Sequence, residues 1–275
     1  MPELAEAEFF RKRWDLAACG TIIANVLTHE RAGVFRGCDP IVVRRHLTQA
    51  RFLGSQAAAK QILFRFSGDC WLGIHLGMSG ELRAEPASYV PQKHDHLALV
   101  TARHTLVFSD PRMFGRVQFH HDPVPPAWWT NIAPALNSPA FTCEAVANFL
   151  LRRARSQLKA VLLLQERFPG IGNWMADEIL WRAALHPKRL AGSLEPAEVR
   201  ALWRECRHVS GLALDTIAGK GADLPPDLNA RIPKTWLFLH RWSDGGRCPK
   251  TNKPLRRETV GGRTTCWSPA RQKLR

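Results

Sequence analysis

The amino-acid sequence predicts an α+β protein with more than one domain. Three observations support this class. Short β-branched and aromatic runs alternate with turns up to residue 122, and apolar residues follow helical spacing in the middle of the chain, whereas residues 236–275 are basic with little periodicity. The length of 275 residues is sufficient for a hydrophobic core in each of two ordinary domains.

The N-terminal part begins with a predicted helix over residues 5–19, where Phe9, Phe10 and Trp14 fall at helical spacing before Gly20. Several short strands follow at a spacing that is typical of an antiparallel sandwich or barrel. We therefore expect residues 1–122 to form one β-rich domain with a flanking helix. The predicted strands lie at residues 21–27, 61–66, 71–76, 96–100 and 105–108.

The remaining chain is predicted to contain a linker, a helical domain and a small β element. Proline-rich residues 123–136 form the linker, because prolines stiffen a chain and interrupt helices and strands. The helical domain covers residues 137–235, including a Gly-, Pro-, Asp- and Asn-rich segment at 219–233 that we expect to be a mobile loop. Residues 236–275 are predicted to be a β element, with nine Lys or Arg against one acid from 247 onwards. The predicted helices lie at residues 142–151, 156–168, 174–185 and 196–217.

The overall composition points to a polyanionic partner. The 39 basic and 24 acidic residues give a net charge of +15 and a pI near 10.2, which favours a nucleic acid. A basic protein without such a partner is the alternative. No apolar run approaches the roughly 18 residues that span a membrane, and the N-terminus lacks a signal-peptide pattern. The seven cysteines are scattered and odd in number, as expected in a reducing compartment.

The first residues combine a proline with two carboxylates. Removal of Met1 would give Pro2 a free secondary amine, a nucleophile that can form an iminium ion with a sugar aldehyde carbon. Glu3 and Glu6 lie within one helical turn and could transfer the protons of such a reaction. The alternative is an ordinary helix start, because proline and acidic residues both suit a first turn.

Two further stretches carry residues of possible functional interest. Residues 156–187 contain two helices joined by Pro-Gly-Ile-Gly-Asn, where backbone N–H groups and the Asn173 side-chain amide could hold a phosphate at a helix N-terminus. Lys60 lies at the mouth of a predicted buried strand, where a lone lysine is usually just solvated.

A third group of residues lies on predicted loops at 75–80, 93–96 and 110–115. Met78, Arg112 and Phe114 could wedge into a base stack and fill the space left by a flipped nucleotide. The alternative places Met78 and Phe114 in the protein core.

Five motifs occur together in a fixed order. They are Met-Pro-Glu-Leu at 1–4, His-Leu-Gly-Met-Ser-Gly at 75–80, Asp-Pro-Arg-x-Phe-Gly at 110–115, Gly-Ile-Gly-Asn with Ala-Asp-Glu-Ile-Leu at 170–180, and Gly-Gly-Arg-x-Thr at 261–265. In this order the chain resembles the formamidopyrimidine-DNA glycosylase / endonuclease VIII family over residues 1–272. The resemblance implies an N-terminal antiparallel β-sandwich with a flanking helix, a helical domain with a helix–two-turn–helix, and a C-terminal β-hairpin finger.

The resemblance also implies roles for individual residues. Pro2 corresponds to the nucleophile that attacks C1′, Glu3 to the acid/base that opens the sugar ring, and Glu6 to a supporting carboxylate. Phosphate contacts are implied for Lys60, Asn173 and Arg263, and void filling for the Met78, Arg112 and Phe114 trio. The expected catalytic residues are thus Pro2, Glu3, Glu6 and Lys60, and the expected DNA-binding residues are His75, Met78, Arg112, Phe114, Asn173 and Arg263.

The C-terminal finger departs from the family, which often has four zinc-binding cysteines there. Alignment on Gly262 and Arg263 places the four ligand positions at Cys248, Thr251, Ser268 and Arg271, so three of four ligands are missing. Structural zinc requires four Cys or His ligands. We therefore expect no zinc, no other metal and no cofactor, and a finger held by packing, for instance through Trp267 and Pro254.

The resemblance implies a bifunctional DNA glycosylase and abasic-site lyase of base excision repair, which acts through a Pro2 iminium ion and β- and δ-elimination. Oxidised purines such as 8-oxoguanine or formamidopyrimidine are the first expectation, and oxidised pyrimidines are the alternative. A non-catalytic damage-binding protein and a structural nucleic-acid module are the other hypotheses. We expect damaged double-stranded DNA as the partner, no membrane, a monomer, and a cytoplasmic, nucleoid-associated location. The sequence leaves open the preferred lesion and the preferred opposite base.

Overall fold

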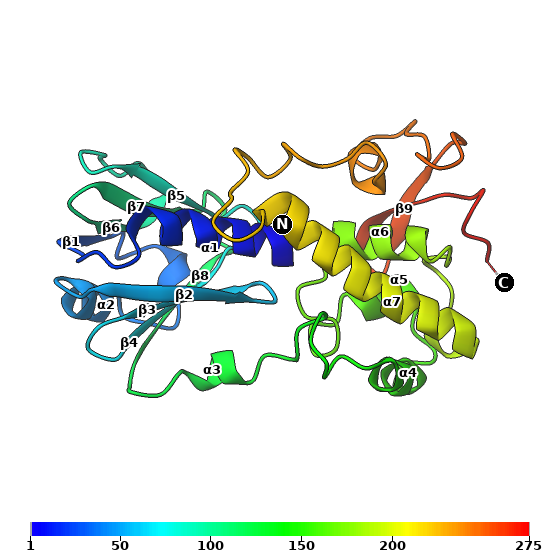
Figure 1. Ribbon diagram of the computed structural model, residues 1–275, viewed down its shortest axis with the longest axis horizontal. Helices are drawn as coiled ribbons and strands as arrows, with labels where there is room; N and C mark the ends of the chain where they lie inside the picture. Colours follow the sequence, from blue (N-terminus) through cyan, green and yellow to red (C-terminus); the bar gives the residue numbers. More distant parts are fainter. Residues whose placement is uncertain (1, 275) are drawn as a thin grey trace. The chain divides into compact units, whose positions relative to one another are not determined.

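The computed structural model describes residues 2–274, which fall into two compact units (Figure 1). The first unit extends to Ile132 and also includes Ala218–Leu224, and the second comprises Ala133–Ile217 and the chain from Pro225 onwards. Antiparallel sheets, helices and a C-terminal hairpin confirm the predicted α+β class. Within residues 2–274 no helix is both long and apolar enough to cross a membrane.

The first unit is a sandwich of two four-stranded antiparallel sheets, with strand orders β1-β6-β7-β5 and β2-β3-β4-β8. The unit also contains α1, α2, the short α3 and a 3-10 turn, η1. The strands are β1 (Asn25–Thr28), β2 (Phe52–Ala58), β3 (Gln61–Phe66), β4 (Cys70–His75), β5 (Glu81–Pro86), β6 (Asp95–Val100), β7 (His104–Ser109) and β8 (Arg116–His121), and the helices are α1 (Leu4–Ala18), η1 (Gly33–Phe35), α2 (Pro40–Leu47) and α3 (Ala127–Thr130).

Helix α1 is fixed to both sheets. Trp14 is fully buried, and its ring lies 4.9 Å from that of Phe64 on β3. Its indole N–H donates a 2.9 Å hydrogen bond to the carbonyl of Arg83 on β5, in the other sheet. Burial of one large apolar side chain contributes about 1.5–3 kcal/mol. This anchor fixes the direction in which the N-terminal end of α1 projects.

Helix α2 is an element that the sequence analysis did not predict. Asp39 caps it, because its carboxylate accepts a hydrogen bond from the Ile41 amide at 2.8 Å, and Pro40 occupies the first turn. Val43 and Leu47 are completely buried under the helix. This Asp-Pro start is the sequence signal that could have identified α2.

The predicted strand at residues 21–27 is shorter in the structure. Its first half forms irregular hydrogen bonds with the chain around the start of β2. The Ile23 amide donates to the Ala50 carbonyl, and the Phe52 amide donates to the Thr21 carbonyl. Regular pairing begins only at Asn25, which lies opposite Val100 on β6.

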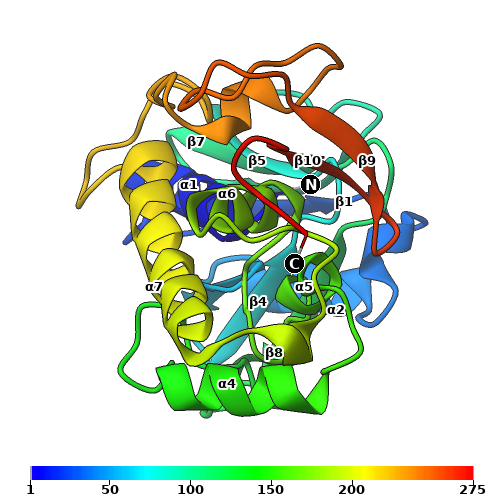
Figure 2. The ribbon, with the colours of Figure 1, turned by 90° about the vertical axis from the view of Figure 1, so that its right-hand side faces the viewer.

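The second unit contains four helices and a two-stranded hairpin (Figure 2). The predicted helix at 156–168 is wrong beyond its first turns, because α5 ends at Leu162. There the Gln165 side chain donates to the Leu163 and Ile171 carbonyls and accepts from the Gly170 amide, which fixes a loop. The elements are α4 (Cys143–Arg152), α5 (Leu158–Leu162), α6 (Asn173–Arg182), η2 (Ala191–Ser193), α7 (Pro196–Ala213), a π-helical turn η3 (Leu214–Ala218), η4 (Leu237–His240), β9 (Arg256–Val260) and β10 (Arg263–Trp267).

The C-terminal hairpin turns at Gly261 and Gly262. Both residues have positive φ angles, of 57° and 73°, which favour glycine. A Cβ on Gly261 would lie 2.9 Å from the Ala160 side chain, so this turn packs directly on α5. Strand β10 also lies against α6 (Figure 2). The hairpin is therefore an integral part of the second unit.

Candidate active site and nucleic-acid interface

Pro2 immediately precedes a helix start that fixes two carboxylates. Glu3 is the N-cap of α1, and its side chain accepts a hydrogen bond from the Glu6 amide, while the Glu3 amide donates to Glu6 Oε2 at 3.1 Å. Glu3 is only 1% exposed and Glu6 only 8%. This capping box places both carboxylates at the positive end of the helix dipole. Met1, whose removal the sequence analysis expects, lies outside the described residues.

Lys60 occupies the tight turn between β2 and β3. The next residue, Gln61, is in register with His75 at the end of β4, so Lys60 and His75 lie at the same end of these two central strands. Burial lowers the pKa of His75, and the positive charges of Lys60 and two arginines lower it further. The neutral ring accepts a 3.1 Å hydrogen bond from the Gly77 amide at Nδ1, which leaves the proton on Nε2. His75 thereby fixes the start of the loop that presents Met78.

Asp110 joins the Met78 loop to the loop at 110–115. It is completely buried, and it accepts hydrogen bonds from Ser79 Oγ at 2.6 Å and from the Gly115 amide at 2.6 Å. A Cβ on Gly77 would lie 2.4 Å from the Gly115 nitrogen, so the two loops touch along their backbones. Asp110 and this backbone contact therefore connect the two loops.

The side chains on these loops point outward. Phe114 is 50% exposed, and Arg112 stacks over its ring at 4.9 Å. Met78 is half-buried. Arg36 supports this loop from behind, because its guanidinium donates to the carbonyls of Gly115 and Phe114. An exposed phenylalanine on a rigid loop is unlike a core residue and suits insertion into another molecule.

The second unit brings Asn173 and the hairpin turn together. The side-chain nitrogen of Asn173, Nδ2, donates a 2.8 Å hydrogen bond to the backbone carbonyl of Thr264. Thr264 is the neighbour of the exposed Arg263. Asn173 is the first residue of α6, directly after the glycine turn, so its surroundings include the positive end of a helix. These two predicted phosphate-binding residues therefore lie side by side.

A buried ion-pair network supports this arrangement, and the sequence analysis missed it. The Asp177 carboxylate is 2.6 Å from Lys159 Nζ and 2.6 Å from Arg241 Nη2, and it also accepts from the Cys266 amide at 2.9 Å. Lys159 in turn donates to the Asn173 carbonyl at 2.6 Å. One carboxylate thus connects α5, α6, the chain after η4, and β10.

The four positions aligned with zinc cysteines still converge. Trp181 Nε1 donates to Cys248 Sγ at 3.3 Å, and the Arg271 guanidinium lies 5.4 Å from the Trp181 ring centroid. Burial raises the pKa of Cys248, but hydrogen bonds from Thr251, Trp181 and Ser268 outweigh it and lower the pKa to about 7. One thiol, two hydroxyls and a guanidinium do not match the donor set of structural zinc.

Lys12 on α1 is a second buried residue that the sequence analysis missed. Its ammonium donates to the carbonyls of Ala218, Gly219 and Asp223 at 2.8, 3.0 and 2.6 Å. It thereby binds the start of the predicted loop at 219–233 to the first unit. Within a run of three basic residues at 11–13, nothing in the sequence distinguishes Lys12 from a solvated lysine.

The sequence matches two domains of one enzyme family. Residues 1–117 match the N-terminal domain of formamidopyrimidine-DNA glycosylase, and residues 132–221 match the H2TH domain of the same enzyme. The chain is 33% identical over 282 residues to the formamidopyrimidine-DNA glycosylase of Thermus thermophilus, which covers 99% of this chain and 98% of the relative. It is 34% identical over 279 residues to that of Laribacter hongkongensis, with 99% and 100% covered.

Solved structures have the same fold. The Lactococcus lactis formamidopyrimidine-DNA glycosylase, solved in complex with DNA containing an oxidised pyrimidine, superimposes with a TM-score of 0.86 at 25% identity, covering 99% of this chain and 100% of that one. Sequence and fold together define a DNA glycosylase of base excision repair. The chain belongs to the formamidopyrimidine-DNA glycosylase family.

Proposed function

We propose that the chain is a bifunctional DNA glycosylase and abasic-site lyase that removes oxidised bases from double-stranded DNA. The observation that carries the proposal is the capping box that fixes Glu3 and Glu6 directly beside Pro2. The capping box of α7, at Glu195 and Glu198, also lies beside a proline, but Glu195 is exposed, whereas Glu3 and Glu6 are both buried. The names of the relatives favour formamidopyrimidine as the first substrate, and we propose 8-oxoguanine, another oxidised purine, beside it.

The proposed chemistry begins after removal of Met1. The Pro2 amine attacks C1′ of the damaged nucleotide, the bond between C1′ and the base breaks, and the base leaves with a proton. Opening of the sugar ring gives an iminium ion, and this step requires a proton on the ring oxygen that Glu3 is placed to supply. Loss of a C2′ proton then expels the 3′ phosphate, and a second elimination expels the 5′ phosphate. The iminium nitrogen accepts the electron pair, so the reaction needs no metal.

DNA binding is proposed to use both units. In the first unit, Lys60 supplies a positive charge for a phosphate, and His75 holds the loop of Met78. Arg112 and Phe114 would enter the duplex where the damaged base leaves the stack. In the second unit, Asn173 and Arg263 would hold the backbone beside the lesion. The net charge of +15 adds attraction that is independent of sequence.

We also propose that the C-terminal finger works without zinc. Trp181 connects two of these positions, because its indole donates to Cys248 and Arg271 stacks over its ring. The Asp177 network attaches β10 to α6 independently of them. Arg263 can therefore be presented to DNA without a metal.

Borohydride trapping tests the enzymatic proposal. Borohydride reduces an iminium ion to a stable amine and so links protein and DNA. The substrates are matched duplexes with 8-oxoguanine, an oxidised pyrimidine, an abasic site or no damage, and mass spectrometry of the free protein establishes whether Pro2 is the N-terminal residue. We expect an adduct on damaged duplexes only, and its rate on each lesion ranks the substrates.

Two variants sharpen this test. Pro2→Gly should lose the adduct, whereas Glu3→Gln should bind the abasic duplex with wild-type affinity but cleave it at least about 100-fold more slowly, as expected for loss of a proton-transfer group. No adduct on any duplex, from protein with a free Pro2 that binds damaged DNA tightly, would support the damage-binding alternative instead. Faster trapping on the oxidised pyrimidine would reassign the substrate class.

A further inference from the structure

Three potential metal ligands meet in the first unit, at the end of β4 opposite to His75. They are His46 on α2, Cys70 at the start of β4 and His121 at the end of β8, and one ligand atom from each lies within 4.8 Å of the others. The sequence predicts no metal here, and its one candidate metal site is the C-terminal finger. These three residues are far apart in the sequence and form no motif, so only the fold brings them together.

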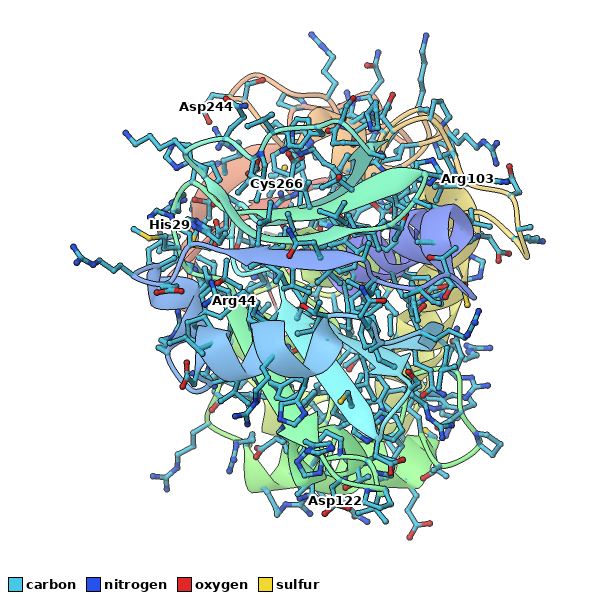
Figure 3. All side chains as sticks on the ribbon, turned by 90° about the vertical axis from the view of Figure 1, so that its left-hand side faces the viewer. His29, Arg44, Arg103, Asp122, Asp244 and Cys266 are labelled. Atoms are coloured by element: carbon cyan, nitrogen blue, oxygen red, sulfur yellow. The ribbon has the colours of Figure 1, made fainter. Side chains whose placement is uncertain are left out.

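The backbone fixes all three positions. Cys70 and His121 are directly opposite each other in the antiparallel pairing of β4 with β8, so their side chains emerge on the same face. His46 is on the last turn of α2, which Val43 and Leu47 anchor in the core. The rings of His46 and His121 are already 4.4 Å apart. Figure 3 views this end of the unit, with α2 and its Arg44 in the foreground.

Two imidazoles and a thiol are a donor set that suits Zn²⁺. Zinc binds histidine nitrogen at about 2.0–2.1 Å and cysteine sulfur at about 2.3 Å, which puts ligand atoms roughly 3.3–3.6 Å apart. Side-chain rotations that bring the ligand atoms about 1 Å closer together would shorten the present separations to these distances. His121 is exposed and His46 is half-buried, so both rings have room for such rotations. Three protein ligands leave a fourth tetrahedral position for water.

The present hydrogen bonds of these side chains are ones that a metal ion could replace. Arg45 approaches His46 Nε2 at 3.3 Å and is exposed, so it can turn away into solvent. Cys70 is a buried thiol within hydrogen-bonding distance of the Gly68 carbonyl, at 3.2 Å, and zinc would replace its proton.

We propose that His46, Cys70 and His121 bind one Zn²⁺ ion. The ion is coordinated by two imidazole nitrogens, one thiolate and one water molecule. It connects α2 to the β4–β8 edge of the sandwich. This site is separate from the C-terminal finger, where the donor set does not fit, and from the catalytic residues at the start of α1.

Cobalt substitution tests the proposal on the tag-free, full-length protein. Co²⁺ takes the same ligands as zinc, and a bound thiolate gives a charge-transfer band in the near ultraviolet. We expect this band to saturate at one equivalent of Co²⁺ and to disappear when one equivalent of Zn²⁺ is added. Zinc affinity is then measured by competition with a chromophoric chelator.

The variants separate this site from other cysteines and histidines. His121→Ala and Cys70→Ser should each weaken zinc binding at least about tenfold, and Cys70→Ser should also remove the thiolate band. The control is His120→Ala, because His120 is adjacent in β8 but points to the opposite face, and it should bind zinc like the wild type. Since His121 is exposed, its removal should leave the fold intact even where Cys70→Ser does not.

Three outcomes would overturn the proposal. The first is no thiolate band at any Co²⁺ concentration up to ten equivalents. The second is unchanged zinc affinity in folded His121→Ala protein. The third is loss of the band in Cys248→Ser but not in Cys70→Ser, which would place the metal in the finger.

Discussion

Replacing Asp177 should destabilise the second unit more than any single change in the hairpin itself. Its carboxylate is completely buried between two cations, Lys159 and Arg241, which are themselves almost completely buried. Asp177→Asn keeps the volume of the side chain but removes the negative charge. The two cations then remain in the interior without the charge that balances them.

The size of the effect follows from these contacts. Removal of one partner from a buried ion pair destabilises a protein by about 3–5 kcal/mol. With a urea m value of about 2 kcal/mol/M, the midpoint of unfolding should fall by about 2 M. Replacing the whole network by apolar residues, as Lys159→Met, Asp177→Leu and Arg241→Met together, should be less destabilising than Asp177→Asn alone. No charge is then left uncompensated.

Urea unfolding combined with hydrogen exchange measures this loss. Exchange in α6 and β10 should rise in Asp177→Asn, whereas the strands of the first unit should keep their protection. The matched control is Arg257→Met, which breaks a 2.9 Å ion pair with the 89% exposed Asp244 and should change stability by less than about 1 kcal/mol. If Asp177→Asn lowers stability by less than about 1 kcal/mol, the network does not attach the hairpin as we describe.

Three further predictions concern the loops and the finger. Gly77→Ala should lower cleavage of damaged duplex at least about tenfold, because its Cβ would lie 2.4 Å from the facing loop, whereas Gly68→Ala, also at positive φ but with nothing within 4 Å, should stay active in the same gel assay. The fold lowers the pKa of Cys248 from 9.0 to about 7. The Cys248 thiolate therefore adds to the free energy of unfolding above pH 9, and this contribution is lost as the pH falls through 7. Urea unfolding over pH 6.5–9 should show this slope in the wild type, and Cys248→Ser should flatten it. Lys12→Met should speed amide exchange in residues 218–224 at least about tenfold, because three carbonyls lose one donor, and unchanged exchange would refute that role.

The strands that the sequence predicts are largely those in the middle of the sheets. β3, β4, β6 and β7 are central strands, and their buried β-branched and aromatic residues give a clear pattern. The strands that it misses, β2, β5 and β8, are all edge strands. An edge strand pairs on one side only and tolerates polar residues, as in Glu-Leu-Arg-Ala-Glu-Pro of β5. Its position depends on the neighbouring strand, which local composition does not encode.

The site shows a similar division. Motifs in the sequence predict Pro2, Glu3 and Phe114 as site residues, because each lies in a short segment with characteristic neighbours. The residues that hold such segments in place were not identified, because their partners are distant in the chain. Lys12, for example, binds carbonyls some 206 to 211 positions away. Burial of a charged residue is a property of the fold, and no local pattern predicts it.

The zinc-free finger that we propose needs other contacts in place of a metal. In a four-cysteine finger, the metal joins two pairs of thiolates and supplies much of the folding energy. Here the Trp181 indole donates a hydrogen bond to the single sulfur of Cys248, and Arg271 packs on the same indole. Such hydrogen bonds contribute only about 1–3 kcal/mol each, which is less than a structural zinc ion supplies.

The remaining stability must come from contacts outside the four ligand positions. Asp177 provides them, because it binds the β10 backbone from α6 and is fixed by two cations of its own. Cys248→Ser should therefore destabilise the second unit less than Asp177→Asn does, because it leaves no buried charge uncompensated. A larger loss in Cys248→Ser than in Asp177→Asn would instead mean that the surroundings of Cys248 hold the finger together.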